Sequence, residues 1–166
     1  MTTQISNAGP AINPILAFGT WVAQTPDTWP EDAKHSAFRE FIDTIAVILP
    51  GVKEGATLNA MKTLTHWGTG NTTAVGFKES LPTPWAALIN GTSGHALDLD
   101  DNFDPPKAHA STVLVPAILA LGEELGASGA DCIDAYIVGL QILGRVGQGI
   151  NPAHRNRGWH ATATVG

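Results

Sequence analysis

The chain has 166 residues, of which 43% are hydrophobic and 14% charged, so it is long and apolar enough to bury a core. The low charge excludes a highly charged disordered segment, and the net charge of −6 argues against general nucleic-acid binding. A single cysteine, Cys132, excludes an internal disulfide, and the lack of a secretory leader or a membrane-length apolar run predicts a cytoplasmic chain with no membrane association.

The first half of the chain predicts three helices. An Asn-Pro pair at 13–14 is typical of a capped helix start, because proline is tolerated at the first helical position. Apolar residues recur every three or four positions between Pro30 and Pro50, which predicts a long second helix. A third helix is expected over 56–66, and residues 72–77 suit a short extended piece.

The second half predicts three more helices. One opens at 83–84 with a Thr-Pro pair, and Ser111 is expected to cap an apolar helix that ends at Gly126. Ser128 and Asp131 resemble a capping box and open the next helix. Two-residue alternation is almost absent. We therefore predict an all-α fold, a multi-helix bundle with at least half of its residues in helices.

The last eight residues look like the first turn of a helix that then stops. So short a helix is not stable by itself, because nucleation is repaid only after several hydrogen bonds form. We therefore expect residues 1–166 to form a single all-helical domain that is an incomplete fragment of a longer protein.

A dense group of polar residues lies between the fourth and fifth predicted helices. On a continuous helix, His95, Asp98 and Asn102 would share one face, since their spacing is i, i+3 and i+7. The neighbouring carboxylates repel one another unless cations or hydrogen bonds offset the repulsion. A solvated acidic loop explains the same pattern. The group comprises His95, Asp98, Asp100, Asp101, Asn102 and Asp104, and His109 follows it.

The segment from residue 135 to the end carries positive charge and no acidic residue. Arginine matches carboxylates and phosphates in bidentate geometry, so this asymmetry favours an anionic ligand. His160 is expected at a helix N-terminus, where free backbone N–H groups attract anions. A basic surface loop accounts for the composition equally well. The residues are Arg145, Arg155, Arg157, His154 and His160.

Two function classes follow from the residues alone. Asp100, Asp101 and Asp104 fit the DDxxD pattern of a magnesium-dependent prenyl-diphosphate enzyme, although no second acidic motif accompanies them. A non-catalytic helical interaction module is the other class. It would lack a clustered His/Asp pocket that binds a polycarboxylate.

A third function class comes from the resemblance of three motifs to those of a known protein family. LINGTSGHALDLDD (88–101), HASTVLVPAILALGE (109–123) and GWHATATVG (158–166) are similar, in order and spacing, to motifs of the MmgE/PrpD family. The resemblance implies a lyase or isomerase that dehydrates, decarboxylates or epimerises a small polycarboxylate by general acid–base chemistry. It also implies a homodimer without metal or organic cofactor, built from a helical domain and an α/β lid. By the same resemblance, residues 1–166 are the N-terminal part of the helical domain, without the lid.

The resemblance also assigns residues. Asp98, His109 and His160 match the family's catalytic positions. The family draws further lysines from downstream segments, so we expect this chain alone to be catalytically inactive and to self-associate through uncovered apolar helix faces. The residues expected to bind substrate are Asn102, His95, Asp101 and Arg157.

Overall fold

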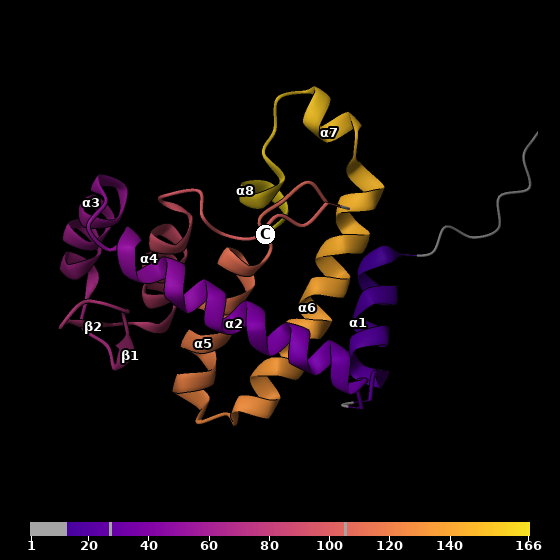
Figure 1. Ribbon diagram of the computed structural model, residues 1–166, viewed down its shortest axis with the longest axis horizontal. Coiled ribbons are helices and arrows are strands. Elements are labelled where there is room, and N and C mark those ends of the chain that lie inside the picture. Colours follow the sequence, from indigo (N-terminus) through magenta and orange to yellow (C-terminus); the bar gives the residue numbers. More distant parts are fainter. Residues whose placement is uncertain (1–12, 27, 105) are drawn as a thin grey trace, which may run out of the picture.

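The computed structural model describes residues 13–26, 28–104 and 106–166, and helices account for 68% of it (Figure 1). The prediction of an all-α fold is confirmed. The elements are α1 (Pro14–Gln24), α2 (Glu31–Gly51), α3 (Gly55–Leu64), the 3-10 turn η1 (Thr65–Trp67), β1 (Thr72–Thr73), β2 (Ser80–Leu81), α4 (Thr83–His95), α5 (Ser111–Leu125), α6 (Gly129–Ile150), α7 (Ala153–Asn156) and α8 (Ala161–Val165).

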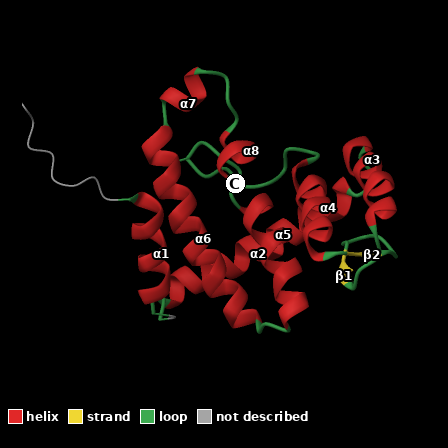
Figure 2. Ribbon diagram, turned by 180° about the vertical axis from the view of Figure 1, so that it is seen from behind, coloured by secondary structure: helices red, strands yellow, loops and turns green. Residues whose placement is uncertain are grey.

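Helix α5 lies at the centre of the bundle. It packs against α4 on one side and α6 on the other, and α2 crosses over all three (Figure 1). Helix α3 and the small sheet lie at the α4 end, whereas α1 lies beside α6 at the opposite end (Figures 1 and 2). The chain returns from α6 through α7 to α8, which places its last described turn over the middle of the bundle.

Local signals at three of the helix ends behave as the sequence predicts. The Asn13 side chain accepts hydrogen bonds from the first-turn N–H groups of α1. Ser128 and Asp131 form the reciprocal bonds of a capping box at the start of α6. Gly126 ends α5 in the left-handed conformation, with φ of 64°, which glycine adopts without steric cost.

The only sheet in the described residues is a two-stranded ribbon. Thr72 pairs with Leu81, and Thr73 with Ser80, in antiparallel register. The extended piece expected over 72–77 is therefore confirmed for two residues only. The backbone turns at Gly76, where φ is 83°, and this turn ends the strand.

The buried apolar residues form three clusters, and one of these clusters supports the loop between α4 and α5. It consists of Ala108, Ala110, Leu143 and Ala161. By contrast, one apolar face of α2 stays exposed. That face comprises Phe38, Ile42, Ile45 and Leu49, which are between 36% and 54% exposed.

Two glycines allow close contacts, one between α2 and α4 and one between α6 and the loop before α5. A Cβ on Gly51 of α2 would lie 1.9 Å from the carbonyl oxygen of Ser93 in α4. A Cβ on Gly147 of α6 would lie 2.1 Å from Cβ of Pro106, in the loop before α5. The lack of a side chain at these positions lets α2 approach α4 and lets the loop rest directly on α6.

None of the helices in the described part of the chain combines the length and apolarity that crossing a bilayer requires.

Candidate functional site

The loop between α4 and α5 departs from the predicted helix. Helix α4 ends at His95, and Asp98 has a φ of 56°, in the left-handed region that aspartate enters more readily than most residues. The expectation that His95, Asp98 and Asn102 share a helical face is therefore wrong. These three side chains are held by a loop and do not form one helical face.

Three histidines from distant parts of the sequence meet at this loop. His95 ends α4, His109 precedes α5, and His160 is the N-cap residue of α8. The ring centroids of His95 and His109 lie 4.7 Å apart, and each lies 5.9 Å from the ring of His160. We call these three residues the histidine cluster. The sequence predicted all three as site residues but gave no indication that their rings would be in contact distance.

A buried carboxylate supports two of the three rings. The side chain of Asp100 is 1% exposed, and its Oδ2 and Oδ1 atoms lie 2.9 and 3.1 Å from Nδ1 of His95. The same Oδ2 lies 3.5 Å from Nδ1 of His109. That nitrogen is buried and has no hydrogen-bond partner within the described residues. Sequence reasoning considered Asp100 only as a metal ligand and missed this role, because a spacing of five residues follows no helical or strand pattern.

Asp98 lies on the open side of the cluster. Its Oδ1 atom lies 3.8 Å from Nε2 of His109, and its side chain is 81% exposed, against 13% for His109. His109 is thus placed between two carboxylates, one buried at Nδ1 and one solvated near Nε2. An imidazole in this position can act as a general acid or base toward a bound ligand.

Asp101 points to a helix end and not to the histidines. Its Oδ1 accepts a hydrogen bond of 2.8 Å from the backbone N–H of Ser111, the first residue of α5. Burial raises the pKa of Asp101, and the hydrogen bonds from Ser111 oppose that rise. The prediction that Ser111 caps α5 is therefore wrong. Ala110 is the N-cap residue, Asp101 satisfies a free N–H group, and Ser111 Oγ instead bonds the hydroxyl of Tyr136.

A cavity of about 550 Å³ lies beside the histidine cluster. His109, His160 and Asn102 line it, so three of the predicted site residues share this cavity. Its wall also carries two cations, Lys107 and Arg155. Lys107 already pairs with Asp104, whereas Arg155 forms no ion pair within the described residues. The aromatic part of the wall is Phe103 and Trp159.

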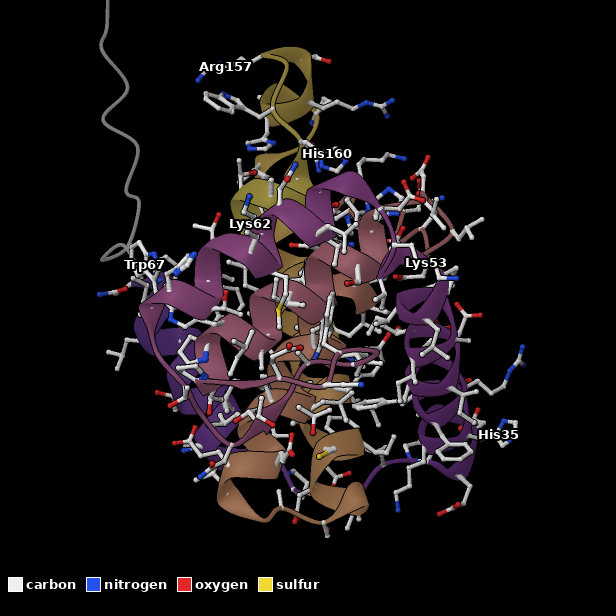
Figure 3. All side chains as sticks on the ribbon, turned by 90° about the vertical axis from the view of Figure 1, so that its left-hand side faces the viewer. His35, Lys53, Lys62, Trp67, Arg157 and His160 are labelled. Atoms are coloured by element: carbon white, nitrogen blue, oxygen red, sulfur yellow. The ribbon has the colours of Figure 1, made fainter. Side chains whose placement is uncertain are left out.

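Arg157 does not line this cavity. It is exposed and follows α7, and Figure 3 shows it at the outer end of the α7–α8 segment, farther from the bundle than His160. The structure thus places Arg155 at the site. The sequence analysis singled out Arg155 only as one of three arginines in a positively charged segment.

A second cavity, of about 590 Å³, also reaches His95 and His160. Its remaining lining is mostly small or apolar and comes from α4, α5 and α8, including Leu88, Gly91 and Ala163. The histidine cluster therefore borders one cavity with cationic groups and one that is largely apolar.

Two hydrogen bonds join the loop before α5 to the segment that follows α6. The backbone N–H of His109 donates to Thr162 Oγ1 over 2.8 Å, and Asn151 Nδ2 donates to the carbonyl oxygen of Pro106 over 2.6 Å. The loop before α5 is therefore bonded to the segment that carries Arg155 and His160.

Within the described residues, two sets of side chains lie close enough to share a metal ion: His95, His109 and His160, and His95, Asp98, Asp100 and His109. Of the three carboxylates of the DDxxD pattern, only Asp100 belongs to one of these sets, and the three do not form a set together. Asp100 contacts histidines, Asp101 contacts Ser111, and Asp104 contacts Lys107. The magnesium-dependent alternative therefore finds no support in the geometry.

Residues 17–166 match the family model described as the MmgE/PrpD N-terminal domain. The chain is 27% identical over 172 aligned residues to the cis-aconitate decarboxylase-like protein oryM of Aspergillus oryzae, covering 98% of this chain and 36% of that protein. It is 29% identical over 147 residues to cis-aconitate decarboxylase of Aspergillus terreus, covering 84% of this chain and 30% of that protein.

A 70-residue stretch is 37% identical to cis-aconitate decarboxylase of Mus musculus, covering 40% of this chain and 14% of that protein. The chain spans about a third of the length of the two fungal relatives. Because the family model matches nearly the whole sequence, the chain belongs to the MmgE/PrpD family and corresponds to its N-terminal domain.

Proposed function

We propose that this chain supplies the histidine-bearing part of the active site of a lyase or isomerase that acts on a small polycarboxylate. One observation carries the proposal: three imidazoles cluster together, and two of them, His109 and His160, line a cavity whose wall also holds the cations Arg155 and Lys107. The relatives named cis-aconitate decarboxylase make cis-aconitate the first substrate to test.

The residues have distinct parts in this proposal. His109 and His160 exchange protons with the substrate or bind its carboxylates, and Asp98 orients the His109 ring or a substrate hydroxyl. Arg155 binds a carboxylate in the cavity, where a guanidinium can form two parallel hydrogen bonds. Asn102 lines the same cavity and adds a neutral hydrogen-bonding group.

Each reaction of this class needs such groups. In a decarboxylation, the bond to the leaving carboxylate breaks, its electron pair stays on the substrate, and an imidazolium returns a proton to carbon. In a dehydration, an imidazole takes the proton next to a carboxylate while an acid protonates the departing hydroxyl. Histidine suits both roles, because it changes charge near neutral pH. The protein works as a homodimer in the cytoplasm under this proposal and uses no metal or organic cofactor.

The test measures binding and turnover separately. The 166-residue chain is titrated with cis-aconitate, methylcitrate and iminodisuccinate by calorimetry, with propionate as a monocarboxylate control. We expect one or more polycarboxylates to bind and propionate to bind far more weakly. We expect turnover only from a longer protein that contains this segment together with a lid. A longer protein that turns over none of the three substrates would contradict the proposal.

The alternative of a non-catalytic helical module makes the opposite prediction. It requires no clustered histidines and no polycarboxylate binding, so the same titration separates the two. The exposed α2 face of Phe38, Ile42, Ile45 and Leu49 is compatible with either.

A further inference from the structure

We infer that Asp100 is a positioning residue, whose buried carboxylate holds His95 and His109 with hydrogen on Nδ1 and so leaves both Nε2 atoms free to exchange a proton with substrate. The inference rests on the proposed function, because it assigns a role within that site. The contacts of the Asp100 side chain point to this role.

The surroundings of Asp100 explain why the arrangement is rigid. The side chain is 1% exposed, so water contributes little to its hydrogen bonds, and a buried carboxylate must find its partners within the protein. Its side chain bonds Nδ1 of His95, at 2.9 and 3.1 Å from the two oxygens, and its Oδ2 lies 3.5 Å from Nδ1 of His109 without a hydrogen bond. Rotating the His95 ring would leave the buried carboxylate without this bond.

The chemistry of the carboxylate selects the tautomer. An ionised carboxylate only accepts hydrogen bonds, so a ring nitrogen that faces it must carry the hydrogen. In a neutral imidazole the other nitrogen, Nε2, then has a free lone pair. This is the relation by which the aspartate of a Ser-His-Asp triad orients its histidine. At His109 the contact is long, and catalytic hydrogen bonds of this kind often shorten when substrate binds.

An amide replaces this carboxylate only in part. Nδ1 of His95 lies within 3.1 Å of both oxygens of Asp100. In Asp100→Asn, whichever way the amide is oriented, both its carbonyl oxygen and its NH₂ group face that nitrogen. The carbonyl oxygen still accepts the Nδ1 hydrogen, whereas the NH₂ group donates and therefore opposes it. The substitution is therefore expected to weaken the preference for hydrogen on Nδ1 and to raise the share of His95 with hydrogen on Nε2, with almost no change in side-chain volume.

The first test uses the 166-residue chain, labelled with ¹⁵N. Long-range ¹H–¹⁵N spectra at alkaline pH distinguish a ring nitrogen that carries hydrogen from one that does not, and His→Gln variants assign the signals. We expect hydrogen on Nδ1 of His95 and His109 in the wild type, and a larger share of His95 with hydrogen on Nε2 in Asp100→Asn. The matched control is Asp101→Asn, a carboxylate in the same loop that contacts Ser111 and leaves the tautomers unchanged.

Two results would overturn the inference. One is a wild-type chain with hydrogen on Nε2 of His95, a result that needs no variant to fold. The other is an Asp100→Asn chain that is folded by circular dichroism and keeps the wild-type tautomers.

The second test measures turnover in a longer protein that contains this segment. Asp100→Asn should lower kcat on the order of 10²-fold with little change in KM, and Asp100→Glu should restore part of the loss because it keeps the carboxylate. A kcat equal to that of the wild type, despite a changed tautomer, would refute the positioning role. If the wild type turns over no polycarboxylate, the proposed function fails, whereas the spectra still decide whether Asp100 sets the tautomers.

Discussion

Ser111 of α5 and Tyr136 of α6 share a buried hydrogen bond, with 2.8 Å between Ser111 Oγ and the Tyr136 hydroxyl. The backbone N–H of the same serine donates to Asp101. Two helices and the loop that carries the site residues therefore meet at Ser111. Because both bonds lie inside the protein, each is shielded from competition with water.

Tyr136 should titrate as a buried phenol. Its pKa is raised to about 12, mainly by burial and in addition by Asp101 and Glu40, while the hydrogen bond with Ser111 opposes part of the rise. It is the one tyrosine of the sequence, so absorbance at 295 nm reports it alone. We expect a midpoint near 12 in the folded chain and near 10 in urea.

The sign of the linked stability change follows from these values. The folded-state pKa lies above the unfolded one, so the contribution of Tyr136 to stability is complete below pH 10 and is lost as the pH rises toward 12. The free energy of unfolding, measured by urea denaturation at several alkaline pH values, should therefore fall across this window. A native midpoint near 10 would show that the phenol is solvated.

Gly147→Ala tests the contact between α6 and the site loop. The new Cβ would lie 2.1 Å from Cβ of Pro106, so the loop must shift. We expect the free energy of unfolding to fall by about 1–3 kcal/mol. Gly149→Ala is the matched control, because a Cβ there meets nothing within 4 Å. That substitution should stabilise the chain by about 0.5–1 kcal/mol. Equal effects of the two alanines in urea denaturation would contradict the packing described here.

His109→Ala should abolish most of the catalysis in a longer protein that contains this segment. Removing a general acid or base lowers the rate by about 10²-fold or more. His35→Ala is the control, since His35 is exposed on α2 and lies far from His160 in Figure 3. Steady-state kinetics with cis-aconitate gives the comparison. An unchanged rate for His109→Ala would remove this residue from the proposed mechanism.

Arg155→Ala should weaken polycarboxylate binding more than Arg157→Ala does. Both arginines are exposed, but Arg155 lines the cavity and Arg157 does not. Loss of a hydrogen bond to a charged group is worth about 1.5–3 kcal/mol, or on the order of 10- to 100-fold in affinity. Calorimetric titration of both variants measures the difference. A larger loss of affinity in Arg157→Ala would contradict this prediction and would assign carboxylate binding to Arg157, as the sequence analysis expected.

The parts of the fold that the sequence predicted are those determined by neighbours in the chain. Asn13 caps α1, Gly126 ends α5, and Ser128 with Asp131 opens α6, because each signal acts over no more than four residues. Ser111 marks the limit of this reasoning. A serine just before an apolar run predicts a cap, but the side chain of Asp101, ten residues earlier, took that role.

The candidate site was predictable as a set of residues and not as an arrangement. The motifs pointed to His95, His109 and His160, yet a helical continuation past His95 was wrong, and Asp98 left the helix at positive φ. The role of Asp100 depends on burial between two rings, which are brought together only by the packing of α4, α5 and α8. No local pattern encodes that burial.

The bonds from Asn151 to Pro106 and from His109 to Thr162 join segments 45 and 53 residues apart. During synthesis, a nascent chain exposed only through α5 would hold His95, Asp100 and His109 but would have no cavity, because the wall containing Arg155 and His160 would still be unmade. Closing so long a loop costs entropy before any contact repays it, so the cavity forms late in folding. A ligand that binds there selects the completed fold, and its concentration therefore raises the unfolding temperature of the whole chain.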